Sequence, residues 1–374
     1  MKVLHVITGL DAGGAETQLA MLVRHSRHEC DVVTLYNPGP IAEQIRADGT
    51  TVRDVGMRNN RDLRALPRLR SLIADGRYDV VHAHLYRSQI YARPAARLAR
   101  TPVVVTTEHS IGETHIERRR MTSGVRGLYL ASELFSDATI AVSDVVRDRL
   151  VRWGVAPRKI AVIPNGLDTA ALAFDPDARA RARAQFGIAP ETFVIGTLGR
   201  LDPNKRIDMV IDAVAPLLGD SAGGKPAVLL VVGRGEEMDA LKAAAARAGV
   251  ADQVIFAGFQ ADTAAMLAAL DLYVMASVQE TFGLAALEAM ANGLPVLYTV
   301  CPALDGISTA QARQVEGTVA ALRAAFGDAV TAGQRPREPD NAVFSRYGIG
   351  ATADQIDGLY ERLRQRRSRQ RGRA

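Results

Sequence analysis

Two glutamates, Glu280 and Glu288, have the residue type and spacing to bind a polar ligand. Between them a helix is predicted to begin near Gly283 and to end at Gly293, since glycine is preferred just past a helix end. Side chains on a helix lean toward its N-terminus, so the Glu288 carboxylate is expected near Glu280. The free backbone N–H groups of Gly283 and Leu284 lie at the same point. Because carboxylates accept hydrogen bonds from hydroxyl pairs and helix-start amides hold phosphate, a sugar nucleotide would suit this site.

The surroundings of the predicted helix support this placement. Residues 271–277 and 294–298 are short apolar runs, which predict a buried strand on each side of it. Leu284, Leu287 and Ala291 recur at helical spacing and give the helix one apolar face. The alternative is that the first glutamate only caps the helix and that the second is a solvated surface residue.

A second polar set, Gly199, Arg200 and Lys205, lies between an apolar strand predicted at 193–197 and a helix predicted at 207–218. Each cation in such a turn can stabilise negative charge as it develops on a departing diphosphate. The turn is therefore a second candidate site for the phosphates.

The first half of the chain alternates apolar strands with helical stretches, which is the βαβ rhythm of a parallel doubly wound α/β sheet. Its strands are predicted at 2–8, 31–36, 80–83, 103–107 and 139–142, and its helices at 14–27, 41–48, 89–99 and 143–153. The turn with Gly13 and Gly14 is not spaced as G-x-G-x-x-G, and the second strand ends without an acidic residue to hold a ribose. It suits a phosphate or a sugar pressed against the backbone, or it is simply a tight turn.

Histidines fall where strands of this half are predicted to end. His82 and His84 lie at the end of one predicted strand and His109 just after the next, and ligands of parallel sheets gather at the carboxyl ends of strands. His109 is therefore a candidate site residue, with a hydrogen-bonded structural histidine as the alternative. The polar residues 112–126 nearby form either a mobile acceptor loop or a solvated face.

The composition is that of a globular protein with room for two domains, since 48% of its 374 residues are hydrophobic. The two cysteines, Cys30 and Cys301, lack metal-binding spacing, so we expect free thiols in a cytoplasmic chain. No apolar run reaches the length of about 18 residues that a membrane span needs. Asp11 interrupts the first apolar run too early for a signal peptide.

Arginine is concentrated at the end of the sequence. Removing residues 362–374 would lower the net charge from +5 to −2, so the rest of the chain is close to neutral. This argues against nucleic acid as a partner. The tail fits either a peripheral contact with anionic lipid at the inner membrane face or a solvated, frayed end. Its arginines are Arg362, Arg364, Arg366, Arg367, Arg369, Arg371 and Arg373.

These motifs, taken in order, resemble the family 4 retaining glycosyltransferases from residue 1 to about residue 300. The resemblance is carried by Gly13-Gly14, His109, Pro164-Asn165-Gly166, Gly199-Arg200 with Lys205, Gly233-Arg234-Gly235, and Glu280 with Glu288. It implies the GT-B fold, in which two Rossmann-like doubly wound domains face a cleft. We expect an acceptor domain at 1–166, a nucleotide-sugar donor domain at 167–350, and a segment at 351–374 that packs back on the first domain and ends in the basic tail.

The resemblance also implies residue roles. Glu280 would contact the donor sugar and Glu288 the ribose, while His109 would lie near the transferring sugar. Phe259 and Gln260 would lie by the base. The implied catalytic residues are His109, Arg200, Lys205 and Glu280. The implied donor-binding residues are Gly13, Gly14, Gly199, Arg200, Lys205, Gly233, Arg234, Phe259, Gln260, Glu280, Phe282, Gly283, Leu284 and Glu288.

The implied reaction is transfer of a hexosyl group with retention, from a nucleotide sugar to a lipid-linked saccharide or a small molecule. A UDP-sugar is the favoured donor. No metal or cofactor is expected, because cations and a helix start already neutralise the diphosphate. An Asp-x-Asp at Asp175 and Asp177 lies in the domain linker, and we interpret it as chance. A nucleotide-sugar epimerase of the same fold and a non-catalytic sugar-nucleotide-binding protein are the alternatives. The pattern departs from the family after residue 300, where Cys301-Pro302 replaces a glycine-rich turn.

Overall fold

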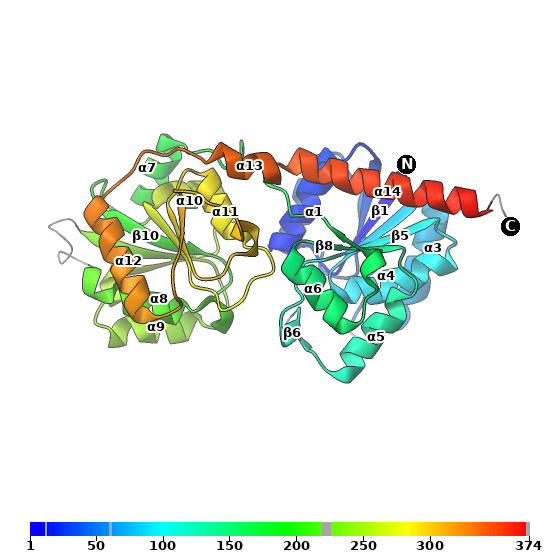
Figure 1. Cartoon of the computed structure of the whole chain (residues 1–374), viewed down its shortest axis with the longest axis horizontal. Helices are drawn as coiled ribbons and strands as arrows, with labels where there is room; N and C mark the ends of the chain where they lie inside the picture. The colour runs from blue at the N-terminus through cyan, green and yellow to red at the C-terminus, as the bar shows by residue number, and fades with distance from the viewer. Residues whose placement is uncertain (12, 60–61, 118, 219–225, 372–374) are drawn as a thin grey trace. The chain divides into compact units, whose positions relative to one another are not determined.

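The computed structural model describes residues 1–11, 13–59, 62–117, 119–218 and 226–371 (Figure 1). The chain divides into two compact units, Met1–Gly166 with Tyr347–Ala374, and Leu167–Arg346. The chain leaves the first unit directly after the Pro-Asn-Gly of residues 164–166, and it returns at Tyr347 instead of at residue 351. Each unit contains a parallel sheet with helices, so the α/β prediction with two doubly wound sheets is confirmed.

The first unit is built on a seven-stranded sheet in the order β3-β2-β1-β4-β5-β8-β9, with every pair parallel. Its strands are β1 (Lys2–Ile7), β2 (Glu29–Thr34), β3 (Val52–Asp54), β4 (Val80–His84), β5 (Val103–Glu108), β8 (Ala138–Ala141) and β9 (Ile160–Val162). Its helices are α1 (Gly14–His25), α2 (Gly39–Ala47), α3 (Ala65–Gly76), α4 (Tyr86–Leu98), α5 (Ser123–Glu133), α6 (Asp144–Trp153) and α14 (Ile349–Arg371). The strand order reverses between β1 and β4, which makes that point the switch where ligands of such sheets bind.

The second unit repeats this plan with a six-stranded sheet in the order β12-β11-β10-β13-β14-β15, again entirely parallel. Its strands are β10 (Phe193–Leu198), β11 (Ala227–Val232), β12 (Val254–Gly258), β13 (Leu272–Met275), β14 (Val296–Tyr298) and β15 (Ala312–Gln314). Its helices are α7 (Pro176–Gln185), α8 (Ile207–Val214), α9 (Met238–Arg247), α10 (Thr263–Ala269), α11 (Leu284–Ala291), α12 (Val319–Ala332) and α13 (Asn341–Tyr347), the last of which ends at the return to the first unit. Here the switch point lies between β10 and β13.

The last helix, α14, belongs to the first unit and completes its core. Ile356 and Tyr360 of α14 pack with Val3 and Val80 of the sheet in one buried cluster. The basic end of this helix is not frayed through Arg371: Arg364 pairs with Asp79 at 3.1 Å, and Arg367 pairs with Asp137. Arg373 lies outside the described residues. Part of the predicted tail is therefore engaged by acidic residues of its own unit.

Several elements were missed by the sequence analysis. The polar segment at 112–126, predicted as a loop or a solvated face, contains the antiparallel pair β6 (His115–Ile116) and β7 (Arg119–Arg120). The same segment contains the start of α5, which is capped because the Thr122 hydroxyl accepts a hydrogen bond from the Val125 amide. The strands β3, β9 and β15 are three residues long, which is too short for a periodic pattern to appear.

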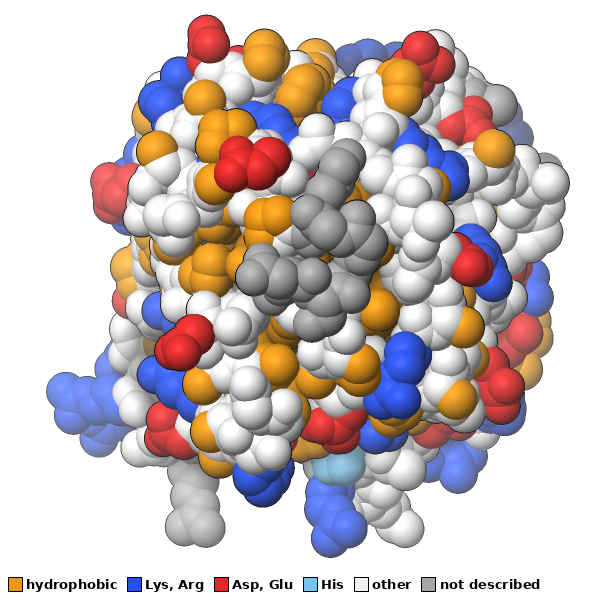
Figure 2. All heavy atoms as spheres, turned by 90° about the vertical axis from the view of Figure 1, so that its left-hand side faces the viewer, with side chains coloured by type: hydrophobic (Ala, Val, Ile, Leu, Met, Phe, Trp, Pro, Cys, Tyr) orange, Lys and Arg blue, Asp and Glu red, His pale blue; other side chains and the backbone are white. Residues whose placement is uncertain are grey.

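The charge on the surface and the composition of the helices both agree with the expectations drawn from the sequence. On the face drawn in Figure 2, Lys and Arg side chains are interspersed with Asp and Glu side chains, so this face lacks the basic field that nucleic acids require. Of the helices in the described ranges, none combines the length and the apolar composition needed to cross a membrane.

Candidate functional site

Most of the predicted site residues of the second unit lie at one edge of its sheet. The strands β12, β11, β10 and β13 are neighbours and run parallel, so their carboxyl ends share this edge. Each strand is followed there by residues predicted for the site: Gly199, Arg200 and Lys205 after β10, Gly233 and Arg234 after β11, Phe259 and Gln260 after β12, and Glu280 after β13. The switch point between β10 and β13 lies in the middle of this set.

Lys205 and Glu280 form an ion pair across the switch point. The Lys205 Nζ lies 2.6 Å from the Glu280 Oε1, and the two side chains are 26% and 14% exposed. Neighbouring residues hold the two loops together: the Asn204 amide donates to the Gln279 carbonyl at 2.9 Å and accepts from the Gln279 N–H at 3.1 Å. The charges of Lys205 and Glu280 therefore neutralise each other before any ligand arrives. Sequence reasoning placed both residues in the site but missed their pairing and the role of Asn204.

Arg200 is exposed at this edge, and it forms no hydrogen bond or ion pair with a described residue. Its side chain is thus available to an anion, unlike that of Lys205. Arg234 instead lies over the ring of Phe259, with its guanidinium carbon 5.1 Å from the ring centroid. Phe259 is 46% exposed, and a large aromatic surface of this kind can stack on a planar ligand. The Gln260 amide donates to the Ala257 carbonyl at 2.7 Å.

The helix α11 starts at the same edge. Gly283 occupies its N-cap position with φ of 101°, and no described side chain caps it, so Glu280 is not the cap that the alternative interpretation required. A Cβ on Gly283 would lie 2.4 Å from the Cys301 Sγ, so this position needs glycine for both its backbone and its space. The Cys301 thiol donates weakly toward the Phe282 and Gly283 carbonyls, and burial raises its pKa to about 12. The side chain of Phe282 is buried.

The buried face of α11 differs from the predicted one. Leu287 and Ala291 are buried as expected, but Leu284 is half-buried. Glu288 is half-buried as well, and burial raises the pKa of its carboxyl to about 7. The Glu288 side chain is therefore only partly open to solvent, unlike the freely solvated residue of the alternative interpretation.

A close contact between two loops shapes the edge beside Arg200. The Gly233 backbone, with φ of 141°, approaches the Gly199 carbonyl so closely that a Cβ on Gly233 would lie 1.8 Å from that oxygen. Leu201 N–H also donates to the Arg234 carbonyl at 3.1 Å. The two predicted glycines therefore hold the loops after β10 and β11 together.

His109 of the first unit follows β5 at the carboxyl edge of its sheet. Burial lowers its pKa to about 4, so the ring is neutral at physiological pH. Its neighbour Glu108 is fully buried, and burial raises the pKa of that carboxyl to about 7. His82 and His84 lie in β4, which ends at His84 as the strand-end prediction implied, and both side chains are buried.

Gly13 and Gly14 begin α1 at the same edge as His109, with Gly13 as the N-cap. The Glu16 carboxylate lies against Gly13, since a Cβ there would lie 2.4 Å from the Glu16 Oε2. A negative charge already next to this helix start favours a hydroxyl donor over a phosphate. One turn later, Gln18 holds both backbone groups of Gly166, at 2.7 Å and 2.9 Å. Sequence reasoning identified the two glycines but not the contact of Glu16 with Gly13 or the bonds of Gln18 to Gly166.

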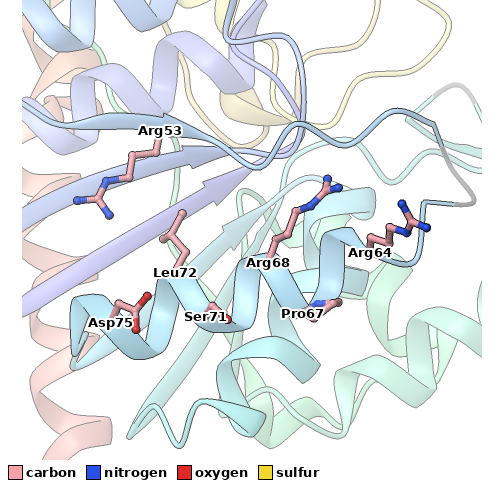
Figure 3. Close-up of a pocket in the computed structure, with 7 residues that line it drawn as sticks. All are labelled: Arg53, Arg64, Pro67, Arg68, Ser71, Leu72 and Asp75. Carbon is pink, nitrogen blue, oxygen red and sulfur yellow. The ribbon is translucent and has the colours of Figure 1, made fainter.

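Two other features carry no predicted site residue. A hollow of about 610 Å³ lies beside β3 and α3, and the side chains of Arg64 and Arg68 project from the helix along it (Figure 3). The Asp175 carboxylate accepts a hydrogen bond from the Asp177 N–H at 2.8 Å and caps α7, so the Asp-x-Asp has a structural role.

Comparison with known proteins extends over both units. Residues 12–171 match the model of glycosyltransferase family 4, and residues 192–332 match that of the glycosyl transferases group 1. The D-inositol 3-phosphate glycosyltransferase of Acidothermus cellulolyticus is 30% identical over 335 residues, which cover 80% of this chain and 72% of that protein.

A second relative and a solved structure add to this. The UDP-Gal:alpha-D-GlcNAc-diphosphoundecaprenol alpha-1,3-galactosyltransferase of Escherichia coli is 28% identical over 241 residues, which cover 64% of this chain and 62% of that protein. The Anabaena protein Alr3699/HepE, solved with UDP-glucose, has a TM-score of 0.81 at 22% identity and covers 96% of this chain and 99% of its own. At that identity the likeness shows a common fold.

Proposed function

The chain belongs to the family 4 glycosyltransferases, and we propose that it transfers a hexosyl group from a UDP-sugar with retention and without a metal ion. Sugar transfer from a nucleotide sugar to an acceptor is the activity of the family. The observation that carries the proposal is the edge of the second sheet, where Arg200, the Lys205–Glu280 pair and the start of α11 follow neighbouring strands. That edge supplies a cation, an anchored carboxylate and free amides.

Each group suits a different part of the donor. Arg200 is exposed and unpaired among described residues, and together with the helix start it suits the diphosphate. The Glu288 carboxylate can accept hydrogen bonds from both ribose hydroxyls, and Phe259 offers its ring to the base. Lys205 holds one oxygen of Glu280, which leaves the other oxygen to accept from a sugar hydroxyl.

The proposed chemistry follows from these positions. As the bond between the anomeric carbon and the diphosphate oxygen breaks, Arg200 and the α11 amides stabilise the negative charge that develops on UDP. The departing phosphate takes the proton of the acceptor hydroxyl, and the acceptor oxygen bonds to the anomeric carbon on the same face. Glu280 stabilises the oxocarbenium-like sugar through its hydroxyls.

We further propose a sugar or polyol hydroxyl as the acceptor, free or lipid-linked. The names of the two relatives support both kinds, an inositol phosphate and a sugar on diphosphoundecaprenol. Exposed arginines at the end of α14, among them Arg362, Arg366 and Arg369, would supply a peripheral contact with an anionic membrane from the cytoplasmic side.

The proposal is tested by thermal shift with UDP-, GDP-, ADP- and dTDP-sugars, followed by transfer assays with and without EDTA. Binding stabilises the folded state, so a UDP-sugar present at about 100 times its Kd is expected to raise the free energy of unfolding by about 2.7 kcal/mol. Activity should survive EDTA. No shift with any nucleotide would refute the donor assignment, loss of activity in EDTA would refute the metal-free reaction, and conversion of the donor without acceptor would favour an epimerase.

The pKa of Glu288 predicts a pH dependence of donor binding. Only the ionised carboxylate can accept from both ribose hydroxyls, and with a pKa of about 7 that form increases as pH rises. We expect the affinity for UDP-glucose to rise roughly tenfold between pH 6 and pH 8, in proportion to the ionised fraction. Titration calorimetry on wild type and Glu288→Gln measures this, with UDP-glucose chosen because it lacks a terminal phosphate monoester. An unchanged pH slope in the variant would assign the titration to another group.

A further inference from the structure

Four histidines of the first unit, His5, His82, His84 and His109, lie together, and the sequence analysis named only His109 as a catalytic candidate. In the register of β1 and β4, His5 faces His82 and Ile7 faces His84, which places the side chains of His5, His82 and His84 on one face of the sheet. The ring centroids of His82 and His84 are 4.1 Å apart, and those of His5 and His84 are 5.4 Å apart. The cluster lies at the switch point between β1 and β4, where a ligand would be expected.

Three of these rings form a hydrogen-bonded chain that ends at His109. The His5 Nδ1 lies 3.1 Å from the His84 Nε2, and the His84 Nδ1 lies 3.3 Å from the His109 Nε2. His84 therefore uses both of its nitrogens within the chain. His82 stands apart from it, bonded to the Tyr360 hydroxyl at 2.6 Å and to the Thr107 hydroxyl at 2.7 Å.

A metal ion is the competing interpretation of the cluster, because ligand atoms of His5, His82 and His84 all lie within 4.8 Å of one another. Each ligand histidine must give a lone pair to the ion. Both nitrogens of His82 already have hydroxyl partners at short distances, so coordination would break one of these bonds. The hydrogen-bonded chain needs no such break and accounts for both nitrogens of His84.

The positions of the protons in this chain of rings follow from the environment of His5, the ring at its buried end. A neutral imidazole has one N–H and one lone pair, so two successive hydrogen bonds force all three rings to donate in the same direction. The His5 Nε2 is buried and has no hydrogen-bond partner among the described residues. An unpaired buried donor is rarer in proteins than an unpaired acceptor, so this nitrogen is expected to carry the lone pair. The His5 Nδ1–H then donates to His84, and the His84 Nδ1–H donates to His109.

We propose that His84 is a positioning residue for His109: its Nδ1–H donates to the His109 Nε2, which fixes the ring and holds it in the Nδ1–H tautomer. With its Nε2 lone pair engaged by His84 and its Nδ1 protonated, the His109 ring has no lone pair left to act as a general base. His5 sets the direction of the chain. The catalytic part of this inference rests on the proposed function, whereas the tautomer does not.

The electrostatics of the cluster agree with a neutral chain. Burial lowers the pKa of His5 to about 3 and that of His84 well below its usual value, with neighbouring histidines adding to the effect at His84. A proton added to the chain would have to remain on a buried ring, where its charge is poorly solvated. This explains why the chain can orient a donor but is unsuited to store a proton.

The first test reads the tautomer directly. The full-length chain is labelled with ¹⁵N-histidine, and a long-range ¹H–¹⁵N correlation spectrum is recorded, with His109 assigned by its loss in His109→Gln. The wild type is expected to show a protonated Nδ1 and an unprotonated Nε2 at His109. His84→Phe keeps a ring of similar size but removes both hydrogen bonds, so the tautomer preference should be lost. His84→Asn, whose amide N–H2 can replace the Nδ1–H, should restore it.

The second test reads catalysis on the same variants. His84→Phe is expected to lower kcat roughly tenfold, the lower end for loss of an oriented polar group in the transition state, with the Kd of UDP unchanged. His84→Asn should recover most of kcat. His25→Gln is the control, because His25 is exposed and its Nδ1 bonds only to the Met21 carbonyl of its own helix.

Three outcomes would overturn the inference: an Nε2–H tautomer in the wild type, a His84→Phe variant with the wild-type spectrum and kcat, or stoichiometric zinc that coordinates the cluster. Melting temperatures identify a variant that fails to fold, and His84→Asn then carries the test. A wild type that binds no nucleotide sugar would refute the proposed function, and the spectrum would still decide the tautomer.

Discussion

Glu280→Gln is expected to lower kcat by roughly 100-fold, equal to about 2.7 kcal/mol of transition-state stabilisation, while UDP binds nearly as in the wild type. The change keeps the size of the side chain but removes the charge that Lys205 holds at 2.6 Å. Without that charge the oxocarbenium-like sugar loses its anchored anionic acceptor. UDP has no transferring sugar, so its affinity should not depend on the carboxylate.

Steady-state kinetics measures kcat of the Glu280→Gln variant, and titration calorimetry measures its affinity for UDP. Lys205→Met serves as the matched partner, because it removes the other half of the ion pair and leaves an unpaired carboxylate near the diphosphate. We expect that variant to lose both kcat and UDP affinity. If Glu280→Gln weakened UDP as much as it slowed turnover, the carboxylate would belong to the nucleotide site and not to the sugar site.

Arg200→Ala is expected to weaken UDP by roughly 30-fold, about 2 kcal/mol, within the usual range for a hydrogen bond to a charged group. Arg200 is the exposed cation of the edge without a described protein partner, so it can give its whole charge to the diphosphate. Lys205 already shares its charge with Glu280. Arg200→Lys should recover only part of the affinity, because an ammonium cannot bind two phosphate oxygens in the forked geometry of a guanidinium.

Arg206→Gln is the control for Arg200, since it removes a cation six residues away on the same loop. The Arg206 guanidinium pairs with Asp208 at 3.1 Å and not with a predicted site residue. Calorimetry with UDP should give the wild-type Kd for Arg206→Gln. Equal losses in Arg200→Ala and Arg206→Gln would mean that general positive charge, and not a specific contact, holds the nucleotide.

The second unit was the more predictable from the sequence. Its strands are continuous apolar runs, as in Ala227–Val232, and its turns contain glycines and charges at the carboxyl ends. The parallel order of strands then brings these turns to one edge without further information. What the sequence could not supply is the partner of each charge: Lys205 and Glu280 are far apart along the chain, and only the folded loops bring them together.

The first unit was harder to predict from the sequence, because its apolar patterns are interrupted by polar residues. The helix α3 includes Pro67 near its start, yet Ala65, Leu69 and Ile73 are buried at helical spacing, and the same spacing in the sequence indicates a helix there. The histidines showed the opposite problem. Their spacing placed His82 and His84 near a strand end, but the register of β1 against β4 puts both of them with His5 on one buried face, which no spacing along a single strand reveals.

The contact between Gly283 and Cys301 makes these two positions a size-coupled pair. Gly283 has no room for a Cβ because the Cys301 sulfur fills that space, and the sulfur lies there because two carbonyls of the helix start face it. A larger residue at one position would require a smaller residue at the other. In engineering terms, residues 283 and 301 should be varied together, because a library that randomises only the loop before α11 would sample mostly broken helix starts.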